Sequence, residues 1–187
     1  MGPEPSGASG TGPRVAAALA AFAGTVTEFL EHLAQEPVDA DVVHAERVAA
    51  PPGGPLGATE GCELWHRAVL LTGRASGRAF VYAESVIAAE RLAPPARDRL
   101  EQTADPIGRV LVAHGHSVDR RPLGAPGVPR WADGRAAGPL AGAVLSRRYR
   151  VHLDGVAAME IAEWFLAPVA DALSATTKGA PLLRPVV

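Results

Sequence analysis

Two pairs of strand-like segments, each joined by a short turn, constrain the fold of this chain more than any other feature. Residues 63–72 and 78–87 are rich in apolar and β-branched residues, and a Gly-containing segment joins them. Residues 143–153 and 157–166 form the second pair, which turns at Asp154-Gly155, a dipeptide typical of tight hairpins. Strands joined by such short turns run antiparallel, so we expect an antiparallel β-sheet.

Helical signals lie between the strand-like segments. Thr25-Val26-Thr27-Glu28 matches a capping box and predicts a helix that starts at Thr25. Residues 92–102 predict a short helix, and Asp105 followed by Pro106 predicts another, with Asp105 as its N-cap. Residues 41–48 alternate between apolar and polar and predict one more strand. We therefore expect an α+β fold, with a single antiparallel sheet packed with helices.

The length of 187 residues fits one domain. We place this domain at residues 14–170, after a disordered Gly-, Pro- and Ser-rich leader at 1–13 and before a C-terminal tail at 171–187. Two Pro- and Gly-rich segments, residues 50–59 and 122–139, are expected to be loops. We interpret the first as a possible flap, and the second as a functional cover or a disordered loop.

Charge and composition exclude several classes of protein. Eighteen Lys and Arg nearly balance 20 Asp and Glu, so the excess of positive charge typical of nucleic-acid binders is absent. No apolar run is long enough to span a membrane. The single cysteine, Cys62, excludes an intramolecular disulfide and favours a reducing compartment; we interpret it as a small buried side chain. We expect a soluble, cytoplasmic protein, monomeric or a small homo-oligomer.

The sequence contains no nucleotide-binding loop, zinc-ligand spacing or nucleophile elbow. His114 and His116 form the closest histidine pair, and on a strand they would face the same side. Without a third ligand in register, exposed or structural histidines are favoured over a metal site. We therefore predict no metal.

A set of elements that can bind an anion is more informative. The helix starts around Val26 and Ile107 offer free backbone N–H groups, and Arg67 lies within an apolar strand. These groups could converge on one carboxylate, although local pattern alone favours an exposed strand position for Arg67. Glu163 lies among large apolar neighbours, where it is either on the solvent face of a strand or buried for a purpose.

Five sequence blocks, taken together in their order and spacing, resemble the chorismate pyruvate-lyase family, which includes actinobacterial 4-hydroxybenzoate synthases. The resemblance covers most of the region from Thr25 to Pro168. The blocks are Thr25-Val-Thr-Glu-Phe29, Leu64-Trp-His-Arg-Ala-Val-Leu-Leu71, Tyr82-Ala-Glu-Ser-Val-Ile87, Asp105-Pro-Ile-Gly-Arg109, and Ser146-Arg-Arg-Tyr-Arg150 leading to Ala162-Glu-Trp-Phe-Leu166.

The resemblance implies an internal ligand cavity covered by flaps, and a reaction without metal or organic cofactor. An anionic small molecule, chorismate, would lose its enolpyruvyl group as pyruvate and leave 4-hydroxybenzoate. Arg67 and the backbone amides of Val26 and Ile107 would hold the ring carboxylate. Glu163 would approach the ring hydroxyl and the departing ether oxygen, as an acid if burial raises its pKa. Arg67 and Glu163 are thus the expected catalytic residues.

The chain departs from better-known bacterial members at one block. Where those commonly have Arg-Thr-Val, this chain has Glu84-Ser85-Val86, which predicts an additional acid, Glu84, among the substrate-binding residues. Arg147 and Arg148 match a basic pair of the family, with a solvated strand edge as the alternative.

Two other functions stay open. The pocket could have been recruited in specialised metabolism as a cyclase or another non-lyase enzyme, because a fold does not fix a function. The chain could also be a non-catalytic small-molecule sensor, since ligand domains of some transcription regulators have a related fold. The absence of a basic helix-turn-helix segment argues against a complete regulator.

Overall fold

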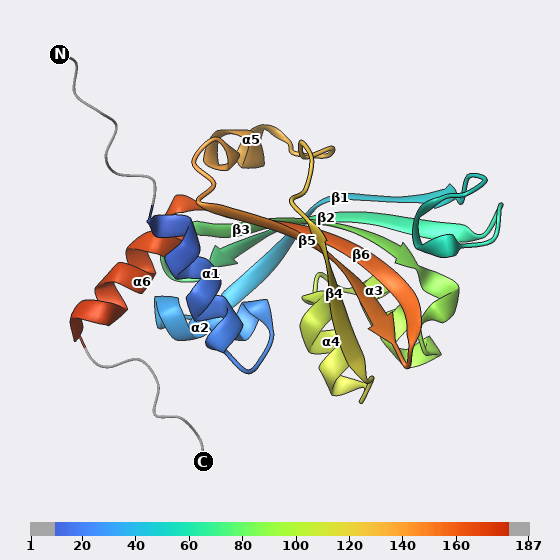
Figure 1. The fold of residues 1–187 in the computed structure, drawn as a ribbon, viewed down its shortest axis with the longest axis horizontal. Helices are drawn as coiled ribbons and strands as arrows, with labels where there is room; N and C mark the ends of the chain where they lie inside the picture. The colour runs from blue at the N-terminus through green and yellow to red at the C-terminus, as the bar shows by residue number, and fades with distance from the viewer. Residues whose placement is uncertain (1–9, 180–187) are drawn as a thin grey trace.

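An antiparallel sheet of six strands, in the order β1-β2-β3-β6-β5-β4, forms the centre of the computed structural model, which describes residues 10–179 (Figure 1). Both predicted hairpins are confirmed: β2 pairs with β3, and β5 pairs with β6. The central contact is between β3 and β6, which joins the two hairpins into one sheet. The strands are β1 Val38–Ala49, β2 Glu63–Gly73, β3 Ala79–Ala88, β4 Val118–Gly124, β5 Leu145–Leu153 and β6 Val156–Phe165.

Strand β4 was not predicted from the sequence. It forms one edge of the sheet and overlaps the start of the expected loop at residues 122–139. Its side chains are almost all exposed. It also contains Pro122, which has no backbone N–H group to donate and is tolerated in an edge strand, where one side has no partner strand. Because neither face of β4 is buried, apolar and polar residues do not alternate along it. The sequence pattern therefore gave no sign of a strand here. The same expected loop also contains helix α5, Gly134–Leu140.

Within residues 10–179, six helices pack on the sheet: α1 Thr11–Ala21, α2 Val26–Ala34, α3 Pro94–Gln102, α4 Ile107–Ala113, α5 Gly134–Leu140 and α6 Ala167–Gly179. Two short 3-10 turns, Pro55–Gly57 and Ala89–Arg91, lie between them. Helix α1 begins inside the expected leader, and α6 occupies most of the expected tail, so ordered structure extends past both predicted boundaries. Residues 1–9 and 180–187 of those segments lie outside the described residues.

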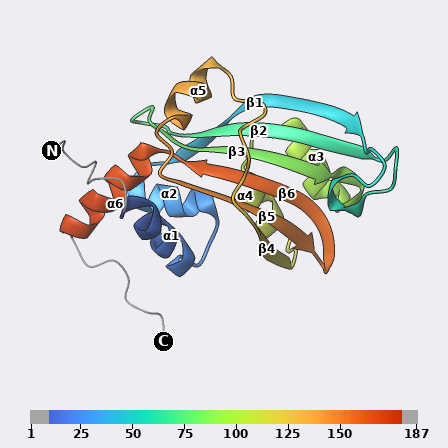
Figure 2. The same cartoon turned by 45° about the horizontal axis from the view of Figure 1, so that its top comes forward.

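The helices divide between the two faces of the sheet (Figures 1 and 2). On one face, α1, α2 and α6 cover one end, around Phe29, Leu71 and Phe165. Helices α3 and α4 cover the other end of the same face, around Leu111 and Ile161. Helix α5 packs on the opposite face. The face shared by two separate helix groups therefore has a boundary between them, and the starts of α2 and α4 lie at this boundary.

The two predicted helix starts have different outcomes. The capping box at α2 is confirmed: Thr25 Oγ1 accepts from the backbone N–H of Glu28 at 3.2 Å, and Glu28 Oε2 accepts from the backbone N–H of Thr25 at 2.7 Å. The prediction that Asp105 is the N-cap of α4 is wrong. Pro106 occupies the N-cap position, and no side chain caps the helix there. The Asp105 carboxylate pairs instead with Arg99.

Within residues 10–179, no helix is both long enough and apolar enough to cross a membrane.

Candidate functional site

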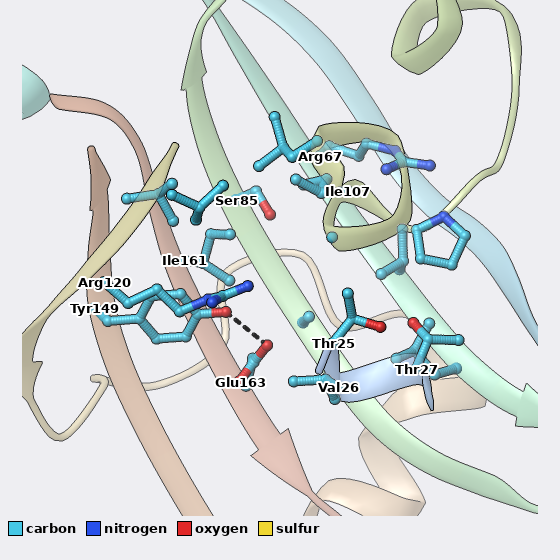
Figure 3. Close-up of a pocket in the computed structure, with 18 residues that line it drawn as sticks. Thr25, Val26, Thr27, Arg67, Ser85, Ile107, Arg120, Tyr149, Ile161 and Glu163 are labelled. Carbon is cyan, nitrogen blue, oxygen red and sulfur yellow. Dashed lines mark hydrogen bonds between the residues drawn. The ribbon is translucent and has the colours of Figure 1, made fainter. Parts of the chain in front are cut away.

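A pocket lies between the sheet and the starts of α2 and α4 (Figure 3). Its volume of about 70 Å³ is several times what one water molecule requires. Five strands contribute side chains from every second position, which is the expected pattern for one face of a sheet. The main strand residues are Arg67 and Val69 from β2, Ala83 and Ser85 from β3, Ile161 and Glu163 from β6, Tyr149 and Val151 from β5, and Val118 and Arg120 from β4.

The two helix starts form the remaining wall of the pocket. Thr25, Val26 and Thr27 come from α2, and Pro106, Ile107 and Gly108 from α4. The helices approach closely at Gly108, where a Cβ atom would lie 3.0 Å from Thr25 Cγ2 and 3.1 Å from Thr25 Cβ. N–H groups in the first turn of a helix have no acceptor within the helix. The close approach places Val26 and Ile107, the two helix-start residues expected to offer free N–H groups, in the lining of one pocket.

Arg67 is a buried cation with no carboxylate within ion-pair distance among residues 10–179, although the charge of Asp105 acts on it. Its side chain is 7% exposed, and Nη1 and Nη2 each donate to the backbone carbonyl of Asp105 at 3.2 Å. Burial lowers the pKa of Arg67 and the charge of Asp105 raises it by less, but a guanidinium stays charged at neutral pH. A buried charge is stable only with adequate partners. Arg67 therefore favours an anionic ligand in this pocket.

Glu163 lies across the pocket from Arg67 (Figure 3). It is buried and accepts from two donors on β5: Arg147 Nε at 2.6 Å from Oε2, and the Tyr149 hydroxyl at 2.8 Å from Oε1. Of the two sequence-based interpretations, the one that placed Glu163 on the solvent face of a strand is wrong, because the residue is buried. Arg147 is not at a solvated edge, because it pairs with Glu163 and stacks on the rings of Tyr149 and Phe165.

Two lining residues were not predicted as site residues. Tyr149 is almost fully buried, and burial raises its pKa well above the ordinary value of 10, so the hydroxyl remains a donor. The sequence signal that could have identified Tyr149 is its spacing: it lies two residues from both Arg147 and Val151, so on a strand it shares their face. Arg120 was missed because β4 itself was missed.

Glu84, also expected among the substrate-binding residues, does not line this pocket. Ala83 and Ser85 face the pocket, and strand alternation points Glu84 to the opposite face. There, Glu84 Oε1 accepts from the Tyr82 hydroxyl at 2.8 Å and from the backbone N–H groups of Arg130 at 2.6 Å and Trp131 at 2.9 Å. Glu84 therefore holds the segment that precedes α5.

The two loops expected to act as flap and cover lie away from the pocket. Pro55 from the first loop and residues 126–131 from the second line a different pocket on the opposite face, together with Glu84, Arg148 and Glu160. Arg148 pairs there with Glu160. The starts of α2 and α4, rather than those loops, cover the pocket that contains Arg67 and Glu163.

The histidines and the cysteine lie outside this pocket. His114 ends α4 and contacts the Val110 carbonyl at 2.8 Å, and His116 lies 3.4 Å from Asp154. Among residues 10–179, no cluster of three or more His, Cys, Asp or Glu side chains is arranged to hold a metal ion. A hydrogen bond with Glu90 and burial raise the pKa of Cys62, which disfavours a nucleophilic thiolate.

No protein-family model matches the chain. Among characterised sequences, it is 31% identical over 157 residues to the chorismate pyruvate-lyase of Mycobacterium tuberculosis (strain ATCC 25618 / H37Rv), an alignment that covers 81% of this chain and 79% of that protein. It is 28% identical over 155 residues to the chorismate pyruvate-lyase of Mycobacterium leprae, with 81% and 73% covered.

Among solved structures, PhnF from Mycobacterium smegmatis has a similar fold, with a TM-score of 0.51 at 15% identity. The match covers 79% of this chain and 66% of the PhnF chain, so it spans slightly less than two thirds of that protein. At this level of identity the similarity concerns the fold alone.

Proposed function

Because this chain belongs to the chorismate pyruvate-lyase family, we propose that it is an enzyme that converts chorismate into 4-hydroxybenzoate and pyruvate. The observation that carries the proposal is the buried Arg67, which has no carboxylate within ion-pair distance among residues 10–179 and lines a pocket that also contains Glu163. An arginine in such a place is suited to bind the carboxylate of a small ligand through charge-assisted hydrogen bonds.

The ring carboxylate of chorismate binds at the Arg67 side of the pocket. Arg67 gives two contacts to the Asp105 carbonyl, and its guanidinium has further N–H groups for a ligand. The first-turn N–H groups of α2 and α4, at Val26 and Ile107, add donors of the kind that bind anions at helix starts. Together these groups fix the orientation of the ring.

The reaction needs no co-reactant. The bond between the ring and the enolpyruvyl oxygen breaks, and the adjacent hydroxyl-bearing ring carbon loses its hydrogen as a proton. The ring becomes aromatic, and the released enolpyruvate takes up one proton to give pyruvate. Aromatisation favours the products strongly, so the main contribution of the protein is to hold the substrate in a reactive orientation in a pocket that excludes water.

Glu163 acts as an acceptor at the far side of the ring. Both of its carboxylate oxygens already accept hydrogen bonds, from Arg147 and Tyr149, and these contacts favour an acceptor role over the role of a proton-donating acid. In this role Glu163 accepts from the ring hydroxyl and aligns the carbon that loses its proton. Tyr149 and Arg147 position the carboxylate.

The direct test is to incubate the full chain with chorismate and to quantify pyruvate and 4-hydroxybenzoate. We expect equal amounts of both products from the wild type, and a loss of about 100-fold or more in kcat/KM for folded Arg67→Ala, since removing one partner of a buried charged pair costs about 2–5 kcal/mol. Glu163→Ala should also lose activity. If the wild type releases no pyruvate above background, the lyase assignment is wrong; chorismate binding without turnover would then favour a sensor.

A further inference from the structure

Arg120 is a second arginine of the pocket, and it comes from the edge strand β4. Val118 and Arg120 line the pocket, whereas alternation directs Asp119 and Arg121 to the other side of the strand. In the sheet, Arg120 lies opposite Val151, which also lines the pocket. Figure 3 shows the nitrogen end of the Arg120 side chain beside the Tyr149 ring and directed into the pocket.

The charge of Arg120 is not neutralised within residues 10–179, where no carboxylate lies within ion-pair distance of it. Its neighbour Arg121 pairs with Asp119 at 2.8 Å. The charge of Arg120 nevertheless has an effect inside the pocket. Burial raises the pKa of Tyr149, and the positive charge of Arg120 lowers it. Arg120 is therefore an exposed cation whose field acts at the Tyr149 hydroxyl.

Two cations that line the pocket, Arg67 and Arg120, have no carboxylate within ion-pair distance among residues 10–179. Glu163 is the carboxylate that lines the pocket, and Arg147 already neutralises it. Arg67 and Arg120 remain, and they lie on opposite sides of the pocket (Figure 3). A ligand with one carboxylate would neutralise one of them. A ligand with two separated carboxylates would neutralise both.

We propose that Arg120 binds the enolpyruvyl carboxylate of the substrate while Arg67 binds the ring carboxylate, so that the pocket selects a dicarboxylate over a monocarboxylate. This inference rests on the proposed lyase function and assigns a specificity-determining residue to it. It also has a consequence for turnover. Pyruvate carries the second carboxylate away, so the remaining product loses the contact with Arg120 and keeps those with Arg67 and Glu163.

Two stable aromatic ethers test the proposal without turnover. The dicarboxylate probe is 3-(carboxymethoxy)-4-hydroxybenzoate, and the matched monocarboxylate is 4-hydroxy-3-methoxybenzoate. Isothermal titration calorimetry would compare the wild type, Arg120→Gln and the control Arg121→Gln. We expect the wild type and Arg121→Gln to bind the dicarboxylate about tenfold more tightly than the monocarboxylate, a difference of about 1.4 kcal/mol. Arg120→Gln should lose this preference and keep its affinity for the monocarboxylate.

The chorismate KM gives a second readout. It should rise about tenfold or more in Arg120→Gln, with a smaller change in kcat, and stay unchanged in Arg121→Gln. Thermal unfolding establishes that both variants fold. The proposal for Arg120 is overturned if Arg120→Gln keeps both the dicarboxylate preference and the wild-type KM. In that case, pyruvate release by the wild type would still support the lyase function. If the wild type releases no pyruvate and binds neither probe, both proposals fall.

Discussion

The Tyr149 hydroxyl donates a hydrogen bond of 2.8 Å to Oε1 of Glu163, while Arg147 takes Oε2 at 2.6 Å. All three residues lie on the two neighbouring strands β5 and β6, and Arg147 is directly opposite Glu163 in the register. The carboxylate is thus held from both oxygens. Its orientation in the pocket is set before any ligand binds, which is the arrangement expected of a preorganised acceptor.

Tyr149→Phe removes one of these contacts and leaves the ring in place. We expect kcat to fall about tenfold and the chorismate KM to change little, because the hydroxyl donates its hydrogen bond to Glu163 and not to a carboxylate of the substrate. The lost buried hydrogen bond should lower the free energy of unfolding by about 1 kcal/mol. Steady-state kinetics and urea denaturation measure both effects. A rise in KM with unchanged kcat would contradict a positioning role for Tyr149.

Arg67→Met should separate activity from stability. Methionine keeps much of the apolar packing of the arginine stem and removes a buried charge that hydrogen-bonds only to a carbonyl among the described residues. We expect pyruvate release to fall about 100-fold or more, while the Tm of the ligand-free protein stays the same or rises. Differential scanning calorimetry measures the Tm. A fall of several degrees would mean that the contacts with Asp105 serve the fold rather than a ligand.

Gly108→Ala should disturb the pocket without removing any functional group. The new Cβ would lie 3.0 Å from Thr25 Cγ2, so α4 and α2 must move apart by a few tenths of an ångström. We expect the chorismate KM to rise about threefold to tenfold, because small displacements of positioning groups are costly. Gly138→Ala in α5 is the matched control, since its Cβ meets no atom within 4 Å. Equal kinetics for the two variants would argue against the helix starts as part of the binding site.

The capping box at α2 should make part of the stability depend on pH. Hydrogen bonds from Thr25, first from its backbone and then from its side chain, lower the pKa of Glu28 below the ordinary value of 4.5. A group with a lowered folded-state pKa stabilises the protein above its unfolded-state pKa, and this stabilisation is lost as pH falls through the folded-state pKa. The Tm difference between wild type and Glu28→Ala should therefore be full at pH 6 and shrink below pH 4.5. A constant difference down to pH 3 would contradict this.

The elements that could be predicted from the sequence are those with strong local signals. Asp154-Gly155 fixes the β5–β6 turn through its positive φ angles, and the Thr25 and Glu28 side chains satisfy each other across one helical turn. Strand β4 has no such signal. It is ordered by pairing along one edge with β5 alone, and that pairing depends on backbone groups rather than on side-chain pattern.

The candidate site could be predicted only in part, and a β-bulge contributes to placing Glu84 outside the pocket that contains Arg67. The β2–β3 hairpin closes with Thr72 opposite Ala79, and regular pairing from there would place Glu84 opposite Arg67. The register shifts next to Leu71, so Ser85 takes that place. Residues directly opposite each other share a face, and a shift of one residue exchanges the faces. Sequence pattern does not reveal the bulge, and Glu84 was expected near the substrate because its block matches a family motif, not because of its pairing.

Because side chains alternate along β3, the adjacent residues Ser85 and Glu84 have separate structural roles on the two faces of the sheet. Ala83 and Ser85 line the wall of the pocket, whereas Glu84 between them anchors the segment before α5 on the far side. Substitutions at Glu84 can alter how that segment is attached while the wall keeps its composition.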